Sequence, residues 1–150
     1  MDRWAAEHTA IVTGANHGIS AAVAVVLGRR GCSVLCTFLR IEHPADPGMP
    51  QSYRDQHRQD ASAVVHQIAG EGGKATAIEA DLSDPTTSAA LFEAAEQHFG
   101  PVDILVNNAT GWVKDTFTPK DRDQIGRPLL PVSPSTWRQE FTVTPWPRPR

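Results

Sequence analysis

The sequence predicts an α/β fold: an incomplete, doubly wound parallel sheet of about four strands with helices flanking it. From Thr9 to Val106, short apolar runs rich in β-branched residues alternate with segments of helical period, which is typical of parallel strands joined by crossover helices. The length of 150 residues and the 40% hydrophobic content suit one domain with its own core. In a doubly wound sheet with right-handed crossovers, the expected strand order is 3-2-1-4.

Each predicted element follows from a local pattern. The first apolar run stops at Gly14, and the helix after it stops at Gly31, because glycine commonly ends helices. The third helix begins at Asp84 and Pro85, since proline suits the first helical turn. The strands are expected over residues 9–13, 33–38, 75–80 and 102–106. The predicted inward faces are Ile19, Val23, Val26 and Leu27 or Arg30 in the first helix, Ala61, Val64, Val65 and Ile68 in the second, and Phe92, Ala95 and Phe99 in the third.

The remaining stretches lack a periodic core pattern. Residues 40–58 are polar and rich in proline, and we expect a long surface loop that lies in solvent rather than over a ligand. Residues 110–134 are expected to be irregular chain, followed by a short helix that starts near Ser133 to Ser135 and ends near Val143. The domain is therefore expected over residues 1–143, with a tail of different character, rich in proline and arginine, over residues 144–150.

Composition excludes several classes of function. The net charge of −3 and the pI near 6.0 give no basic surface for nucleic acid or an anionic membrane, so small molecules are the expected partners. Cys32 and Cys36 have a spacing that suits neither a zinc knuckle nor a disulfide, and we expect buried, reduced thiols. The histidines form no paired ligand spacing, so no metal site is expected. The absence of an apolar leader or a long apolar stretch favours a cytoplasmic location.

The joint between the first strand and the first helix is a candidate phosphate site. Its sequence, Thr-Gly-Ala-Asn-His-Gly-Ile-Ser over residues 13–20, lies where the positive end of the helix dipole and free backbone N–H groups can hold a pyrophosphate. Gly14 would permit a sharp turn, and Gly18 would permit close approach of a phosphate. An ordinary strand-to-helix turn would have the same glycines, so this pattern needs support from elsewhere.

That support comes from a resemblance to the short-chain dehydrogenase/reductase family. Thr13, Gly14 and Gly18 resemble the family fingerprint Thr-Gly-x-x-x-Gly-x-Gly, with Ser20 in place of the last glycine. Residues 81–82, Asp-Leu, resemble the family step whose carboxylate accepts from the adenine amino group. Residues 107–109, Asn-Asn-Ala, resemble the Asn-Asn-Ala-Gly step that lines the ribose, with Thr110 in place of glycine. All three segments follow strands, at the edge where open α/β sheets bind ligands.

The resemblance implies a partial, Rossmann-like NAD(P)-binding domain of an oxidoreductase that transfers hydride between an alcohol or carbonyl substrate and the cofactor. The second strand is followed by Arg40 rather than by an acid, so NADP is favoured over NAD, because an arginine there suits a 2′-phosphate. The complete protein is expected to be a homo-oligomer. The expected cofactor-binding residues are Gly14, Asn16, His17, Gly18, Ile19, Arg40, Asp81, Leu82, Asn107, Asn108 and Ala109.

The catalytic part of the family pattern has no match in these residues. The family uses a serine, a tyrosine and a lysine four residues after the tyrosine. Tyr53 is the one tyrosine of this sequence, and His57 stands four residues later, so we assign no catalytic residue. Thr144 stands where the family has an asparagine, and Pro145 would stop the helix. The chain by itself is therefore expected to be inactive and to be a truncated form.

Two other hypotheses stay open at this point. The chain could be a non-catalytic module that holds a dinucleotide or a partner subunit, or a product without function. A methyltransferase could share a glycine-rich first turn but does not predict the Asn-Asn-Ala step, and the Gly-x-Ser-x-Gly signal of α/β-hydrolases is absent from the sequence.

Overall fold

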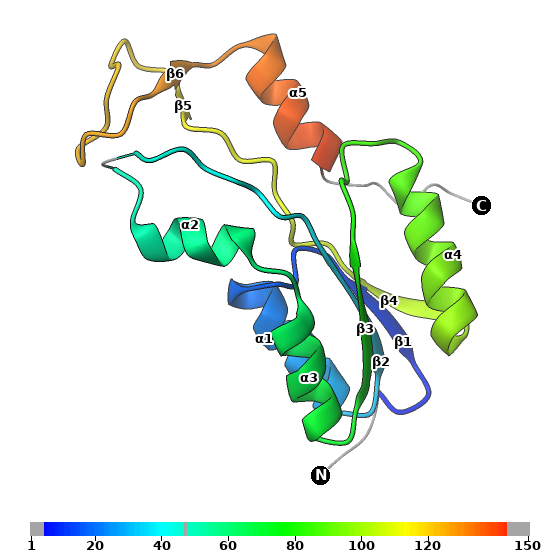
Figure 1. The fold of residues 1–150 in the computed structure, drawn as a ribbon. Coiled ribbons are helices and arrows are strands. Elements are labelled where there is room, and N and C mark those ends of the chain that lie inside the picture. The colour runs from blue at the N-terminus through cyan, green and yellow to red at the C-terminus, as the bar shows by residue number, and fades with distance from the viewer. Residues whose placement is uncertain (1–4, 47, 144–150) are drawn as a thin grey trace.

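The computed structural model describes residues 5–46 and 48–143, and it confirms the predicted sheet (Figure 1). Four parallel strands lie in the order β3-β2-β1-β4. Their bounds are Thr9–Val12 for β1, Ser33–Phe38 for β2, Lys74–Glu79 for β3 and Val102–Val106 for β4. In these described ranges, no helix is both long and apolar enough to cross a bilayer.

Helices cover both faces of the sheet (Figure 1). Helices α1 (Gly18–Arg29) and α3 (Ser62–Gly70) pack together on one face, and α4 (Thr87–Phe99) packs on the other, mainly against β1. Successive side chains of a strand point to opposite faces of the sheet, so the side chains of β1 and β2 contribute to two separate cores. The core under α1 and α3 includes Ala10, Val12, Val34 and Cys36, and the core under α4 includes Ile11, Leu35, Leu91 and Ala95.

The two central strands are nearly inaccessible, whereas β3 and β4 are only half-buried. Within the described residues, β3 and β4 are the edges of the sheet, and each pairs with one neighbour. A strand buried on both faces appears in sequence as a continuous apolar run, which is why β1 and β2 were well predicted.

The predicted inward face of α1 is confirmed in part. Leu27 is buried and Val23 packs against the core, whereas Ile19 is 73% exposed and Val26 is 50% exposed. Small residues are also buried on this helix, because it lies close to α3: a Cβ added at Gly28 would lie 2.6 Å from a methyl carbon of Ile68.

The expectation of a continuous loop over residues 40–58 is also wrong, since α2 (Gln51–Arg58) forms there. Its residues include good helix formers, and Pro50 precedes its first turn, but none of its residues is buried. A polar helix gives no apolar period, so the pattern that located the other helices could not find it.

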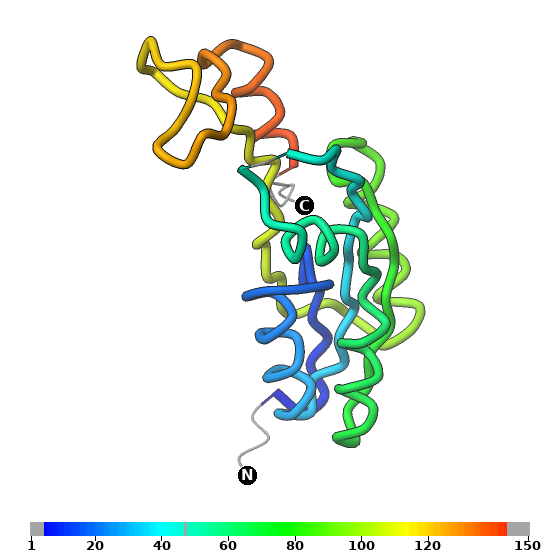
Figure 2. Tube along the Cα trace, turned by 60° about the vertical axis from the view of Figure 1, so that its left-hand side comes forward, coloured from blue at the N-terminus to red at the C-terminus, as the bar shows by residue number. Residues whose placement is uncertain are grey.

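Residues after β4 form a small substructure beyond one end of the sheet (Figure 2). It contains the short parallel pair β5 (Asp115–Thr116) and β6 (Leu130–Pro131), followed by α5 (Pro134–Val143). Ser133 and Thr136 cap α5 reciprocally, because each backbone N–H donates to the other side chain, at 3.0 and 3.3 Å. The predicted short helix is thus present, and the expectations for Thr144, Pro145 and the tail fall outside the described residues.

The long segment after β2 is tied to this substructure. Lys114 Nζ lies 2.7 Å from Asp46 Oδ2, with both side chains mostly buried, and Lys114 holds the pKa of that carboxyl below its usual range. A Cβ at Gly48 would collide with the Arg127 side chain, so the two stretches are in close contact.

The two cysteines are free, buried thiols, as the sequence predicts. Burial raises the pKa of Cys36 to about 12 and, together with the Asp103 charge, the pKa of Cys32 to about 11.

Candidate nucleotide site

The four parallel strands end at one edge of the sheet, and the three predicted motif segments meet there. The glycine turn follows β1, Arg40 comes soon after β2, residues 81–82 follow β3, and residues 107–109 follow β4. Backbone N–H groups and polar side chains at this edge are the usual ligands of nucleotides in open α/β sheets.

Thr13 connects the end of β1 to the end of β4. Its Oγ1 accepts hydrogen bonds from the backbone N–H groups of Asn108 and Ala109, each at 3.0 Å. Its hydroxyl hydrogen faces two acceptors, Val106 O and Asn107 Oδ1, both at 3.4 Å. One buried hydroxyl therefore fixes the position of the Asn-Asn-Ala step relative to the glycine turn.

Glycine is required at two points of the turn for conformational reasons. Gly14 and Gly18 have φ angles of +66° and +64°, where a side chain is strained. A Cβ on Gly14 would also lie 3.4 Å from Ala109, whereas no atom lies within 4 Å of the Cβ position of Gly18. The space beside Gly18 is thus open to a ligand.

The first turn of α1 is available to an anion. His17 occupies the N-cap position, and no side chain there caps the helix. The Nδ1 atom of His17 is buried and has no hydrogen-bond partner. Uncapped N–H groups at a helix start attract negative charge, so these features fit a dinucleotide phosphate.

Ser20, which the sequence reasoning noted only as a departure from the fingerprint, has a clear contact. Its hydroxyl is fully buried and accepts a hydrogen bond of 2.7 Å from Asn108 Nδ2. The Asn108 side chain is thus tethered to α1. The sign of this contact in the sequence was the serine at the position of the last fingerprint glycine, because serine adds a hydroxyl that can form a hydrogen bond.

Asn16 and His17 contact the segment after β2. Asn16 is buried and donates through Nδ2 to the carbonyl of Gln59 at 2.9 Å. The His17 ring lies 4.8 Å from the ring of His57 on α2, centroid to centroid. The expectation that residues 40–58 hang in solvent is therefore wrong for His57, although most of α2 is exposed.

Arg40 is at the predicted place but already has a partner. Its Nε and Nη2 donate to the carboxylate of Glu79, with Nη2 at 2.6 Å from Oε2. This hydrogen-bonded pair raises the pKa of Arg40 and lowers the pKa of Glu79. Both side chains remain partly exposed to solvent, so the guanidinium can still meet a ligand.

Asp81 and Leu82 differ in their surroundings. Oδ1 of Asp81 accepts from the backbone N–H and the hydroxyl of Ser83, at 2.9 and 2.7 Å, which fixes the carboxylate in a turn. Leu82 is buried in the core under α4. Ile19, in contrast, lies exposed on the first turn of α1.

Tyr53 does not take part in the predicted site. It lies on α2, with its ring 4.1 Å from that of His57 and 6.0 Å from that of His43. Ser133, which caps α5, is likewise a structural residue. In the part of the chain that the structure describes, no group of three or more histidine, cysteine or carboxylate residues is placed to hold a metal.

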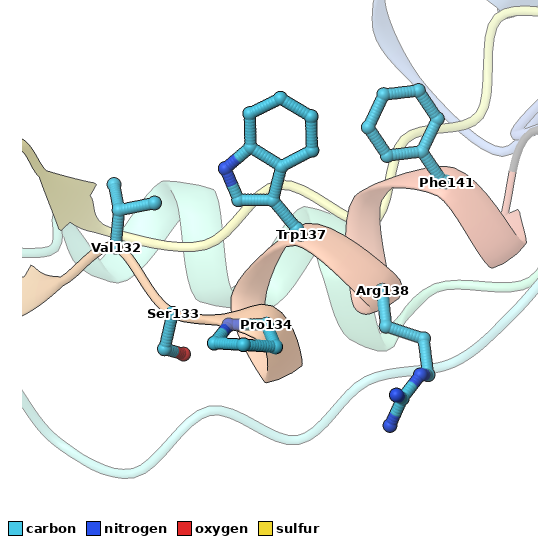
Figure 3. Close-up of a pocket in the computed structure, with 6 residues that line it drawn as sticks. All are labelled: Val132, Ser133, Pro134, Trp137, Arg138 and Phe141. Carbon is cyan, nitrogen blue, oxygen red and sulfur yellow. The ribbon is translucent and has the colours of Figure 1, made fainter.

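A separate, wide-open hollow lies along α5 (Figure 3). The rings of Trp137 and Phe141 are stacked there, with centroids 5.4 Å apart, and both are more than half exposed. None of the residues that line the hollow belongs to the three motif segments; they are Val132, Ser133, Pro134, Trp137, Arg138 and Phe141.

The fold and the edge site define a class, the α/β proteins with a doubly wound nucleotide-binding sheet. Comparison with known proteins gives the family, because the family model described as short chain dehydrogenase matches residues 47–143. This chain belongs to the short-chain dehydrogenase/reductase family, whose members are oxidoreductases that bind NAD(P). The resemblance predicted from the three motifs is thus confirmed.

The curated relatives include several reductases. The chain is 38% identical to versicolorin reductase 1 of Aspergillus parasiticus over 79% of this chain and 40% of that protein. It is 36% identical to a hydroxynaphthalene reductase-like protein of Metarhizium guizhouense, over 77% of this chain and 39% of the relative. The chain therefore spans about 40% of the length of the relatives it matches.

Solved structures agree with the fold. A 3-oxoacyl (acyl-carrier-protein) reductase from Agrobacterium tumefaciens, solved with NADP bound, matches with a TM-score of 0.66 and 28% identity. The match covers 94% of this chain and 43% of that structure. A mutant of a Serratia marcescens short-chain dehydrogenase/reductase gives the same TM-score at 27% identity, over 93% of this chain and 45% of that structure.

Proposed function

We propose that this chain is the dinucleotide-binding part of an NAD(P)-dependent oxidoreductase that acts on an alcohol or a carbonyl compound. The observation that carries the proposal is the network at the sheet edge, in which Thr13 joins the glycine turn to the Asn-Asn-Ala step. The open space at Gly18 and the uncapped start of α1 suit a pyrophosphate.

Each residue of the site has a role in this proposal. The N–H groups of the glycine turn hold the pyrophosphate, and the Asp81 carboxylate accepts from the adenine amino group. The Asn-Asn-Ala step lines the ribose. When bound, the cofactor supplies hydride chemistry, and the residues of this chain contribute binding and orientation. The remaining nucleotide-contacting residues of the proposal are Asn16, His17, Ile19, Arg40 and Leu82.

The preference for NADP rests on Arg40. A guanidinium offers five N–H donors in a planar fork, so Arg40 can bind a 2′-phosphate with donors beyond those that Glu79 uses. Glu79 competes with that phosphate for the same cation. The proposal therefore predicts that Glu79→Gln strengthens the binding of NADPH and leaves the binding of NADH unchanged.

Titration of the full chain with NADPH and NADH, followed by nucleotide fluorescence, tests both parts of the proposal. We expect Arg40→Ala to weaken NADPH about tenfold and NADH little, because one charge-assisted contact is lost. Arg29→Ala is the matched control, since Arg29 makes a similar ion pair with Glu71 away from the carboxyl edge. Folded protein that binds neither nucleotide would refute the function. Equal losses for both nucleotides in Arg40→Ala would refute the role of Arg40.

A non-catalytic dinucleotide-binding module is the second candidate. It is favoured by Tyr53, the one tyrosine of the sequence, which lies on α2 with its ring against those of His43 and His57 and has no lysine four residues later. Consumption of NADPH in the presence of a panel of ketones and quinones tests the module. Turnover by this chain would refute a non-catalytic module, whereas binding without turnover agrees with both candidates, because the sequence has no match to the family's catalytic tyrosine and lysine.

A further inference from the structure

Asn108, which follows β4, is held at two points by the neighbouring strand and helix. Its backbone N–H donates to Thr13 Oγ1 at 3.0 Å, and its side-chain Nδ2 donates to Ser20 Oγ at 2.7 Å. Thr13 follows β1, and Ser20 lies in the first turn of α1. One residue therefore fixes the backbone of Asn108, and a different residue fixes its side chain.

Ser20 is the rigid end of the side-chain contact. It is 0% exposed and lies within a helix, and its hydroxyl is joined to the backbone through one rotatable side-chain bond. Asn108 is an exposed residue, and its amide can turn about two side-chain bonds. The direction of the amide thus depends on Ser20, and the place of the Ser20 hydroxyl does not depend on the amide.

The contact also determines which amide atom is available to another molecule. A carboxamide has one acceptor oxygen and two N–H donors on its nitrogen. Ser20 engages the nitrogen, and within residues 5–46 and 48–143 the Oδ1 atom of Asn108 has no hydrogen-bond partner. Asn108 therefore offers a free acceptor at the carboxyl edge of the sheet.

The strand order indicates which part of a dinucleotide this acceptor meets. Because β1 lies between β2 and β4, Arg40 and Asp81 are on one side of the glycine turn and Asn108 is on the other. A dinucleotide with its adenosine at Arg40 and Asp81 and its pyrophosphate at the turn reaches Asn108 with its second ribose. A hydroxyl can donate to an amide oxygen, whereas a phosphate oxygen cannot. The Oδ1 atom thus suits a ribose hydroxyl.

We propose that Ser20 is a positioning residue for the nucleotide, whose buried hydroxyl holds the Asn108 amide so that Oδ1 accepts from a hydroxyl of the second ribose. This inference rests on the proposed nucleotide-binding function. Glycine, the fingerprint residue at position 20, has no hydroxyl and cannot make this contact. Serine at this position therefore adds a hold on the ribose-binding side chain.

The expected effect on affinity is small but measurable. An ordinary hydrogen bond favours the bonded arrangement by about fivefold. Without it, the amide also occupies other rotamers and its flipped orientation, and the apparent affinity falls with the fraction that is competent to bind. We expect Ser20→Ala to weaken the nucleotide by about two- to fivefold.

The first test is calorimetry on the full chain with two ligands, NADP⁺ and adenosine 2′,5′-bisphosphate, which lacks the second ribose. We expect Ser20→Ala to weaken NADP⁺ by about two- to fivefold and to leave the affinity for the bisphosphate unchanged. Ser88→Ala on α4 is the matched control and should change neither affinity. No loss for NADP⁺, or the same loss for both ligands, would overturn the positioning role.

The same measurement in an Asn108→Ala chain shows whether Ser20 acts through the amide. We expect Ser20→Ala to have no further effect on NADP⁺ affinity in this background, because the side chain that it positions is gone. A general disturbance of α1 would persist in that background. A loss of the same size with and without the Asn108 side chain would therefore contradict the proposal.

A third measurement needs no nucleotide, so it separates a failure of the positioning from a failure of the proposed function. The order of side-chain amides is followed by ¹⁵N relaxation, and we expect the Asn108 amide to be ordered in the unaltered chain and mobile in Ser20→Ala. The Asn16 amide, which donates to Gln59 O at 2.9 Å, is the internal control and should stay ordered in both. Equal mobility of the Asn108 amide in both proteins would overturn the hold. An amide ordered by Ser20 in a folded chain that binds no nucleotide would instead refute the proposed function.

Discussion

The hydrogen bond between Ser20 and Asn108 allows one prediction to be worked through. Ser20→Ala removes the acceptor of Asn108 Nδ2, which now lies at 2.7 Å, and leaves the rest of the packing in place. Leaving a buried donor without a partner costs about 1–3 kcal/mol, and a typical hydrogen bond contributes about 1 kcal/mol net. Ser20 is fully buried, but Asn108 is an exposed residue whose amide can reach water. The lower end applies, so we expect a loss of about 1 kcal/mol in the free energy of unfolding.

Urea unfolding followed by circular dichroism measures this loss, and a double-mutant cycle assigns it to the pair. Asn108→Ala alone and the double variant with Ser20→Ala complete the cycle, in which we expect a coupling energy of about 0.5–1 kcal/mol. Ser88→Ala is the matched control, since Ser88 lies on α4, away from the turn. The reasoning would be refuted if Ser20→Ala cost as much in the Asn108→Ala variant as in the unaltered chain, because the losses would then be additive and the two residues uncoupled.

Two further predictions concern packing and reactivity. Gly28→Ala should destabilise the fold by about 1–2 kcal/mol in the same urea assay, because the new methyl group meets Ile68 at 2.6 Å and the gain in helix propensity offsets only part of that overlap. Gly70→Ala is the control, since the space at its Cβ position is open. An equal effect of both changes would count against the close contact between Gly28 and Ile68. Cys32 and Cys36 should not react with a thiol reagent at pH 8 in the folded chain and should both react in urea, because burial raises the pKa of each thiol to about 11 and about 12. Stoichiometric labelling of the native protein would show that the thiols are not buried as described.

Much of the fold was predictable because it depends on local periodicity. The apolar runs of β1 and β2 and the glycines that end α1 and follow β1 predicted these elements and the place of the turn. The strand order then followed from the right-handed crossovers of a doubly wound sheet. The motif residues Gly14, Gly18 and Asn107–Ala109 were also found from sequence, since each follows a strand and parallel strands end at the same edge. The family comparison confirms the family that these motifs indicate, and the roles of the individual residues stay a prediction.

Contacts between distant segments could not be predicted in this way. The face of α1 depends on how closely Gly28 lets it approach Ile68, and helical period alone favoured Ile19 and Val26 instead. The helix α2 has no apolar face, so its sequence does not indicate which part of the molecule it contacts. The structure shows its His57 ring next to that of His17. Pairing of Arg40 with Glu79 depends likewise on the neighbouring positions of β2 and β3.

The sequence by itself determined that the chain forms a parallel α/β sheet with a glycine turn at its carboxyl edge, because strand and helix periods and glycine conformations are properties of neighbouring residues. Tertiary structure alone decided the network around Thr13, the hydrogen bond between Ser20 and Asn108, and the ring contact between His17 and His57. These contacts join residues more than 35 positions apart in the sequence numbering, with Asn108 88 positions from Ser20. Their partners are fixed only when the sheet brings the ends of its strands together.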